Sequence, residues 1–209
     1  MVDFLVPYIR LPDHSDPLLE EFTYGDIDIR AKKLKDLSKG SFVFFHTSLR
    51  GHKCITAYYV IDRVLDTQEA VKNQLIMDKY KNPHLKRGPY KDKQDVLIFG
   101  DPILSKKLSR PLPFDKNLAK KLSLNIPFDS KHSDNACIVS ATRQWRLLTD
   151  NDVKFLLEEI KRVEAEPISS DILLSTDEVS ELREIDLEDF IARNPSCLGK
   201  GLVLNARAL

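Results

Sequence analysis

Hydrophobic positions are densest between residues 39 and 64, where two apolar runs are separated by a short polar stretch. The first run, residues 42 to 46, is apolar on both faces until its end, which is typical of a strand covered on two sides. The second run, residues 54 to 64, is rich in β-branched and aromatic residues, and only residues 49 to 53 connect the two. This pattern predicts an antiparallel strand pair, whose first strand ends in a histidine and two hydroxyl side chains.

Weaker patterns predict the other elements of a mixed fold. Strands are expected at residues 3–9, 95–102 and 136–140, and helices at 29–37, 67–80 and 115–122. Pro7 would place the first strand at a sheet edge or near a bend, and Gly40 suits the exit from the first helix. In the second helix Val71, Leu75 and Met77 would face inward. Residues 81–94 are basic and broken by prolines and a glycine, which predicts a mobile loop.

The last regular pattern is a helix that ends near residue 164. Thr149 followed by Asp152 is an N-cap signal, and the apolar positions after it fall on one face, at Val153, Leu156, Leu157, Ile160 and Val163. Together these elements predict an α+β domain at residues 1–164, whose small sheet curls into a barrel flanked by helices. A linker is expected at 165–176 and a helical appendage at 177–209.

Composition supports an ordinary globular chain. Of its 209 residues 42% are hydrophobic and 31% are charged, and no apolar run approaches the roughly 20 residues that cross a bilayer. We therefore expect no membrane partner and a cytoplasmic location. The cysteines are odd in number and far apart, which favours reduced thiols over a disulfide framework. The sequence does not indicate an oligomeric state.

The net charge of zero is the sum of two parts of the chain with opposite net charge. Residues 1–165 carry 28 basic and 23 acidic side chains, whereas residues 166–209 carry 4 and 9. Residues 72–121 alone hold 13 basic side chains against 5 acidic ones. Such a basic stretch attracts phosphate backbones, although a solvated lysine-rich face is as common an interpretation.

Motifs that would indicate a complete active site are not found in the sequence. It has no GxxxxGK[ST] phosphate loop, no GxSxG elbow and no HExxH, and its histidines do not fall at metal-ligand spacing. We therefore predict no catalytic residues, metal or cofactor in this chain, and leave open whether it is a fragment of an enzyme.

Three local patterns, in the same order along the chain, resemble the EVE domains of the PUA-like superfamily, which also includes the YTH and ASCH domains. They are FTYGDI at 22–27, KGS followed by FFHTS and ITAY between 39 and 58, and RQWRLLTDND at 143–152. The resemblance covers about residues 3–162. It implies a small curled β-barrel that binds nucleic acid and takes a modified base out of its stack. Ser41, Thr56 and Tyr58 depart from the family pattern, which puts the choice of base in question.

The resemblance, together with the physics of a flipped base, assigns candidate residues. The base pocket would be formed by Phe44, His46, Thr47, Ser48, Tyr58 and Trp145, and the nucleic-acid backbone would be held by Arg50, Lys53, Lys86, Arg87, Arg143 and Arg146. A structural role is the alternative for each aromatic residue, because alternating aromatic side chains usually form core. Trp145 could equally be a packing lid, and His46 a buried structural histidine.

Residues 182–209 resemble the start of a NucS-like nuclease domain of the PD-(D/E)xK class, whose metal-binding residues would lie beyond this stretch. Mg²⁺ would be needed only if such a domain followed. The preferred hypothesis is thus a reader of a modified base in DNA, the specificity part of a modification-dependent restriction endonuclease. The alternatives are a PUA- or YTH-like module for modified RNA and a protein-interaction scaffold. DNA is favoured over RNA as the partner.

Overall fold

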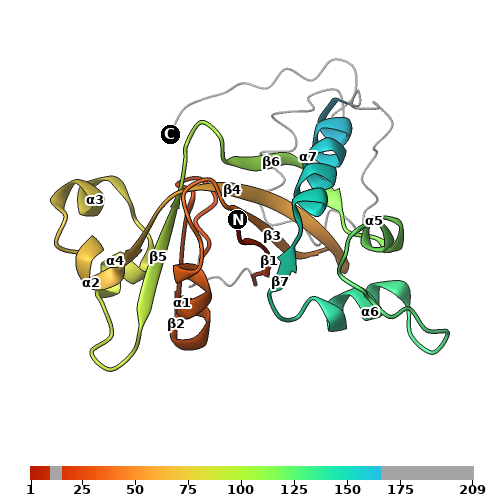
Figure 1. Ribbon diagram of the computed structural model, residues 1–209, viewed down its shortest axis with the longest axis horizontal. Helices are drawn as coiled ribbons and strands as arrows, with labels where there is room; N and C mark the ends of the chain where they lie inside the picture. Colours follow the sequence, from red (N-terminus) through yellow and green to blue (C-terminus); the bar gives the residue numbers. More distant parts are fainter. Residues whose placement is uncertain (10–15, 166–209) are drawn as a thin grey trace, which may run out of the picture. The chain divides into compact units, whose positions relative to one another are not determined.

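The computed structural model describes residues 1–9 and 16–165, which belong to one compact unit, Met1–Ala165 (Figure 1). The strands are β1 (Asp3–Pro7), β2 (Thr23–Ile27), β3 (Phe42–Leu49), β4 (His52–Asp66), β5 (Asp95–Gly100), β6 (Lys106–Pro113) and β7 (Arg146–Leu148). The helices are α1 (Asp28–Lys35), α2 (Thr67–Ala70), α3 (Gln74–Lys79), α4 (Pro83–Arg87), α5 (Lys116–Lys121), α6 (Asp134–Ala141) and α7 (Asp150–Ala165). The predicted linker, the helical appendage, the nuclease-like stretch and Cys197 lie outside the described residues.

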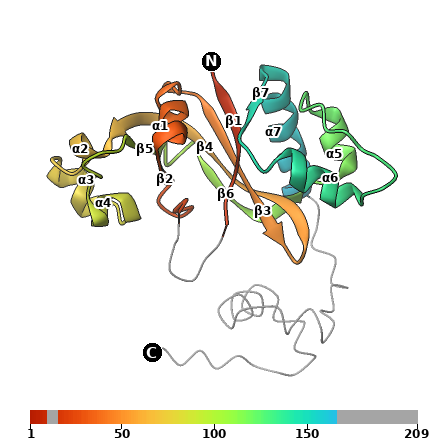
Figure 2. The ribbon, with the colours of Figure 1, turned by 90° about the horizontal axis from the view of Figure 1, so that it is seen from below.

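The seven strands form one mixed sheet, which confirms the predicted α+β class. Its order is β2-β5-β4-β3-β1-β7, and β6 pairs with β4 beside this path. The 15-residue β4 connects the two parts, because its first half pairs with β3 and β6 and its second half with β5. Among the described residues β2 and β7 do not pair with each other, so the sheet of the predicted curled barrel is not closed. Helices α2 to α4 gather at one end of the sheet and α5 to α7 at the other (Figure 2).

The predicted strand pair is confirmed as β3 and β4. They are antiparallel from Phe42↔Val60 to Leu49↔His52, with a register shift between Phe45 and His46. Only Arg50 and Gly51 connect them, and both have positive φ, of 49° and 77°. Two positive φ values are what a tight turn between strands of right-handed twist needs, and glycine adopts them at little cost.

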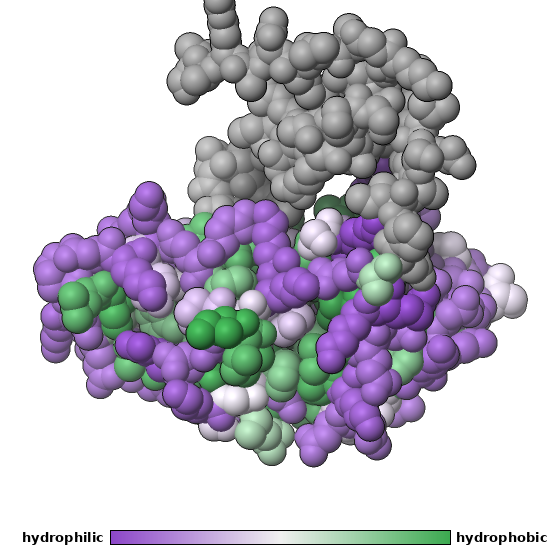
Figure 3. Space-filling model, turned by 90° about the horizontal axis from the view of Figure 1, so that it is seen from above, coloured by the Kyte–Doolittle hydropathy of each residue, from purple (hydrophilic) through white to green (hydrophobic). Residues whose placement is uncertain are grey.

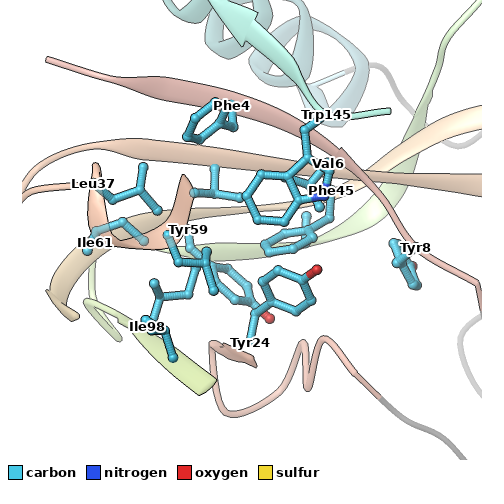
Figure 4. Close-up of a cluster of buried hydrophobic side chains, with 14 of the residues drawn as sticks. Phe4, Val6, Tyr8, Tyr24, Leu37, Phe45, Tyr59, Ile61, Ile98 and Trp145 are labelled. Atoms are coloured by element: carbon cyan, nitrogen blue, oxygen red, sulfur yellow. The ribbon is translucent and has the colours of Figure 1, made fainter. Parts of the chain in front are cut away.

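Both faces of the sheet are buried, as the apolar alternation predicts. On one face Phe45 and Tyr59 pack with Tyr24 and Trp145 in a cluster that α1 completes (Figure 4). On the other face Phe44 packs in a second cluster with side chains of α5, α6 and α7. Neighbouring residues of β3 therefore belong to different cores, because successive strand side chains point to opposite faces.

Helix α7 begins at the predicted cap. The Asp152 carboxylate accepts hydrogen bonds from the backbone N–H and the hydroxyl of Thr149, both at 2.8 Å, while the Asp152 N–H donates to Thr149 Oγ1 at 3.2 Å. This reciprocal pair satisfies donors that the first turn of a helix leaves without partners. The buried residues of α7 are Asp152, Val153, Leu156 and Ile160, so the predicted stripe faces the second core.

Two predicted elements differ from the structure. Residues 136–140 were expected to form a strand but belong to α6, because Ser133 caps this helix and accepts a hydrogen bond from the N–H of Ala136. The expected helix at 67–80 is broken into α2 and α3, since Asn73 caps a new helix there. The break changes the buried face, so Leu75 is 80% exposed and Met77 is exposed, whereas Ile76 is buried between them.

The basic stretch at 81–94 is not a loop throughout. It contains α4, which Asn82 caps and whose side chains His84 and Leu85 are buried. Strands β2, β6 and β7 were not predicted. Pro7 ends β1 next to His46 of β3, and β1 lies between β3 and β7 rather than at an edge. The first helix ends at Lys35, several residues before Gly40, whose positive φ belongs to the turn that leads into β3.

The described surface is mainly hydrophilic, with hydrophobic side chains gathered near the middle of the face in Figure 3. No helix in the described part is long and apolar enough to span a bilayer. Cys54 and Cys137 are both free thiols, half-buried and buried respectively.

Candidate functional site

A pocket of about 890 Å³ is lined by the end of β1, strand β2, helix α4 with the residues after it, and the end of α6, with Asp16, Arg30 of α1 and Lys53 of β4. We call it the β1–α4 pocket. Its lining residues are Pro7, Tyr8, Ile9, Asp16, Tyr24, Gly25, Asp26, Ile27, Arg30, Lys53, Pro83, His84, Arg87, Tyr90, Val139, Arg143 and Gln144. A volume of this size is typical of sites that enclose a small organic group.

Aromatic walls of the pocket are fixed by the core beneath it. Tyr8 follows β1, its N–H donates to the carbonyl of His46 at 3.0 Å, and its hydroxyl lies 2.8 Å from that of Thr56. Tyr24 of β2 donates its hydroxyl to Asp26 at 2.6 Å. Both rings pack edge-on against Phe45 (Figure 4). Tyr8 is 8% exposed and Tyr24 is 6% exposed, so both rings are rigid parts of the first core and only a small part of each borders the pocket.

A third tyrosine lies at the mouth. Tyr90 is 40% exposed, and the guanidinium of Arg87 stacks on its ring at 3.7 Å from the centroid. The same guanidinium donates to Asp95 at 2.8 Å, which ties the exposed ring to the start of β5. Stacking of this kind is worth about 0.5–1 kcal/mol at an exposed site, so Tyr90 is held in place without being buried.

The floor of the pocket is a buried histidine between two carboxylates. His84 of α4 bonds through Nδ1 to Asp95 at 2.6 Å, and its Nε2 lies 3.4 Å from Asp16. The Asp16 carboxylate also accepts from the N–H of Gly25 at 3.1 Å and from Asn82 Nδ2 at 3.2 Å. The imidazole lies so close to Gly25 that a Cβ there would be 2.6 Å from the ring, which explains why this position carries glycine.

The charge states of the floor residues depend on two opposing effects, burial and pairing with opposite charges. Burial alone would lower the pKa of His84, but hydrogen bonds and charges from Asp16 and Asp95 raise that pKa to about 9. Burial raises the pKa of Asp16, and its hydrogen bonds from His84 and Gly25 oppose this only in part. For Asp95 the bonds from His84 and Thr67 outweigh burial, so its pKa is lowered. At neutral pH His84 is therefore an imidazolium.

Cations outnumber carboxylates around the pocket. Arg30, Lys53, Arg87, Arg143 and the His84 imidazolium line it, together with Asp16 and Asp26. Asp26 pairs with Arg30, and Asp95 pairs with Arg87 and His84. Within residues 1–9 and 16–165 neither Lys53 nor Arg143 has an ion-pair partner. Lys53 is half-buried, and burial lowers the pKa of its amine. Among the described residues, the positive charge that carboxylates leave uncompensated is therefore that of Lys53 and Arg143.

Three of the six predicted backbone contacts come together here: Lys53, Arg87 and Arg143. Lys86 is exposed on α4, next to Arg87, and Arg50 is exposed in the β3–β4 turn. Arg146 has a different role, because its guanidinium donates to the carbonyls of Leu124 and Ala141 and so joins α6 to the preceding loop.

The predicted base-pocket residues do not line the β1–α4 pocket. Phe44 and His46 are fully buried, Thr47 is buried and Ser48 is exposed. Tyr58 is half-buried against the second core, on the opposite face of the sheet. Phe44 and Tyr58 lie together in the second core, with ring centroids 5.7 Å apart, whereas Trp145 belongs to the first core.

Trp145 is packed as part of the core rather than as a platform. Only 6% of it is exposed, its ring lies 5.5 Å from that of Phe4 in an edge-to-face contact, and Tyr24 lies 5.9 Å away. Its indole N–H has no hydrogen-bond partner among the described residues. Trp145 also borders a second cavity of about 890 Å³, with Val2, Phe4, Lys33 and Leu147 among its lining residues.

His46 is a neutral, buried residue that does not line the pocket. Burial lowers its pKa to about 3, the nearby positive charge of Lys53 acts in the same direction, and the backbone of Thr142 opposes them weakly. Neither ring nitrogen has a hydrogen-bond partner within the part of the chain that the structure describes. The histidine at the end of β3 is therefore part of the packing, next to Phe114 at 5.8 Å.

Sequence reasoning missed the tyrosines and the floor of the site. Tyr8, Tyr24 and Tyr90 are far apart in the chain, and only the sheet pairing brings the first two together. For His84 a local signal exists, since Asn82 before Pro83 is a helix N-cap followed by proline at the first position of the helix. That signal predicts a helix at this position. The side of such a helix that carries residues 84 and 85 would then face inward.

No group of three or more histidine, cysteine or acidic side chains could hold a metal ion in residues 1–9 and 16–165. No protein-family model and no curated protein matches the sequence. Solved structures with some likeness include ASCH from Zymomonas mobilis, with a TM-score of 0.42 and 7% identity over 75% of this chain and 94% of that one. The DUF55 domain of human thymocyte nuclear protein 1 gives 0.41 and 18% over 76% and 98%. Human THYN1 in complex with DNA containing 5-methylcytosine gives 0.40 and 15% over 80% and 100%.

TM-scores below 0.5 do not establish a shared fold, so these likenesses do not decide the family.

Proposed function

We propose that the chain is a nucleic-acid-binding module that accepts an extruded base in the β1–α4 pocket. The observation that carries the proposal is one pocket that combines the exposed ring of Tyr90 with Lys53 and Arg143, which have no ion-pair partner among the described residues. Aromatic side chains offer a stacking surface to any base, whereas cations at the rim suit the phosphates on either side of it. An acidic or a purely apolar rim would suit neither part of a nucleotide.

The energetics favour a pocket of this kind for a base. Extrusion costs a few kcal/mol of lost stacking and pairing, which the protein must offset. Stacking on an aromatic side chain returns about 1–3 kcal/mol per base. Tyr90 has the most exposed ring of the three tyrosines and is already held by Arg87, so ordering it upon binding costs little conformational entropy.

Polar groups of the pocket would meet the edge of the base and the flanking phosphates. Gln144 and the floor formed by His84 and Asp16 offer donors and acceptors inside. Lys53 and Arg143 stand at the rim without ion-pair partners among the described residues, so they are available to phosphate oxygens. Each phosphate contact releases a counterion, which makes affinity fall as salt rises.

Titration by fluorescence anisotropy tests the proposal. The probes are one duplex DNA with and without 5-methylcytosine, chosen because the THYN1 complex contains that base, its single strands, and the matching RNA, each at two salt concentrations. We expect binding that weakens with salt and prefers a modified DNA duplex. Equal affinity for modified and plain duplexes would refute base reading, and absence of binding to every probe would refute the whole proposal. A preference for RNA would favour the alternative of an RNA-binding module.

Variants of the rim connect this binding to the pocket. Lys53→Ala combined with Arg143→Ala should weaken binding and reduce its dependence on salt, because two phosphate contacts are lost. Lys161→Ala, on the exposed surface of α7, is the matched control and should bind as the unsubstituted protein does. Lys86→Ala should weaken binding to every sequence alike. If Lys161→Ala weakens binding as much as the rim variant, the pocket is not the site.

The role in a modification-dependent restriction endonuclease is proposed on the resemblance at residues 182–209 alone. None of the likenesses to solved structures supports that resemblance. The length of the natural gene product tests it, since a continuation that carries an aspartate and an E-x-K would supply the nuclease. In that case the module described here would select the site, and Mg²⁺ would be required for cleavage only.

A further inference from the structure

Exposed aliphatic and aromatic side chains are few on the described surface, and two of them lie at the mouth of the β1–α4 pocket. Ile9 is 72% exposed and Tyr90 is 40% exposed, and both line that pocket. Ile9 follows β1 and Tyr90 follows α4, so they belong to different segments around one opening. An exposed isoleucine is unremarkable by itself, but its place beside a pocket proposed to take a base gives it a specific use.

The residue before Ile9 is held by the sheet, although the Ile9 side chain is exposed. The preceding Tyr8 is buried, and both its N–H and its hydroxyl are bonded within the sheet. Tyr8 is 8% exposed and Ile9 is 72% exposed, so the buried side chain is followed by one that faces outward. Ile27, Pro83 and Pro7 also line the pocket, which gives this part of the mouth an apolar character.

We propose that Ile9 is a wedge that enters the space a base leaves in the duplex when it moves into the pocket. This inference rests on the proposed function and makes it more specific, because it identifies the ligand as double-stranded nucleic acid. Removing a base from a duplex leaves two unstacked neighbours and a hole. An aliphatic side chain in that hole restores apolar contact with the neighbouring bases and hinders return of the base.

Tyr90 has the complementary task at the same opening. Its ring is fixed by Arg87 on one side, and its exposed fraction is available to a base or sugar outside the pocket. Stacking on Tyr90 would serve single and double strands alike, since every base has a π-face. Filling a hole serves only a duplex. The two side chains therefore differ in a way that an experiment can separate.

The test compares Ile9→Ser with Ile29→Ser. Ile29 is 74% exposed and does not line the pocket, so the control removes the same side chain from an equally exposed place. Both proteins are titrated with a 5-methylcytosine duplex and with the modified strand alone, and 2-aminopurine beside the modified base reports extrusion. We expect Ile9→Ser to weaken duplex binding by about tenfold, which corresponds to about 1.4 kcal/mol. Its affinity for the single strand should match that of Ile29→Ser.

One further variant and one further duplex test the wedge more specifically. Ile9→Leu keeps an aliphatic wedge and should restore most of the duplex affinity. A mismatch opposite the modified base lowers the cost of extrusion, so the loss caused by Ile9→Ser should shrink on that duplex.

The outcomes distinguish a failure of the wedge from a failure of the proposed function. Equal duplex affinities for Ile9→Ser and Ile29→Ser would overturn the wedge and leave the proposed function intact. Equal losses on duplex and single strand would make Ile9 a wall of the pocket and would also overturn the wedge. If the unsubstituted protein binds neither probe, the proposed function itself fails. Thermal melting of both variants checks folding, and exposure at either position predicts no loss of stability.

Discussion

Raising the pH from 6.5 to 9 should destabilise the protein through His84. The pKa of this imidazole is about 9 in the folded chain because Asp16 and Asp95 face it, against an ordinary value of 6.5. The folded state therefore holds a proton that the unfolded chain loses in this interval. That difference of about 2.5 corresponds to about 3.4 kcal/mol, at about 1.36 kcal/mol for each pH unit. The contribution is complete below pH 6.5 and is lost as pH rises through about 9.

Urea denaturation at half-unit steps between pH 6.5 and 9 measures the effect, and the free energy of unfolding should fall by up to about 3 kcal/mol. His84→Gln should flatten the curve, since the titrating group is removed while a hydrogen-bonding side chain remains. His132→Gln is the matched control, because His132 pairs with Asp129 on the surface and both are more than half exposed. A free energy of unfolding that stays constant or rises over this interval in the unsubstituted protein would refute the charged state assigned to His84.

Three substitutions test other parts of the account. Asp152→Ala removes the acceptor for the Thr149 N–H and hydroxyl, and should cost about 2 kcal/mol in urea denaturation; a loss below about 0.5 kcal/mol would exclude the capping role. Gly25→Ala places a Cβ against the His84 ring and should cost about 1–3 kcal/mol and lower the histidine pKa seen by NMR; an unchanged pKa would contradict the close packing. Trp145→Phe should cost about 1 kcal/mol and leave nucleic-acid binding unchanged, since the indole N–H has no partner in the described residues; loss of modified-base preference in a stably folded variant would restore Trp145 as a stacking platform.

Elements that depend on nearby residues were predictable from the sequence. The β3–β4 pair follows from two apolar runs and a short turn, and α7 follows from a cap with an apolar stripe behind it. In each case the residues that decide the structure lie within a few positions of one another. The α+β class followed from counting such elements. The open sheet could not be deduced in this way, because closure depends on whether β2 reaches β7, and neither strand was visible in the pattern.

Short apolar runs were the weak point of the prediction. Residues 136–140 suit a strand by composition, and a helix by the cap at Ser133, which lies outside the run itself. The basic stretch at 81–94 looks like a loop because of its prolines, although Asn82 with Pro83 begins α4. Periodicity has too few positions to act on in a helix of five residues. Capping side chains were the better signal in both places.

The two buried histidines show why the site itself could not be deduced from residue types. His46 lies among apolar groups, so its neutral form has the lower free energy and its pKa falls to about 3. His84 lies between carboxylates from two other segments, Asp16 and Asp95, so its charged form has the lower free energy. Both residues are equally plausible in the sequence as pocket groups, and the polar end of β3 even favours His46. What separates them is the set of partners that the fold brings near. Asp16, bonded to Gly25 of β2, and Asp95 of β5 lie at the two ring nitrogens of His84, whereas the pairing of β3 with β1 and β4 closes around His46. A buried charge survives only beside opposite charge, so the fold assigns the polar floor of the pocket to His84 and the packing to His46.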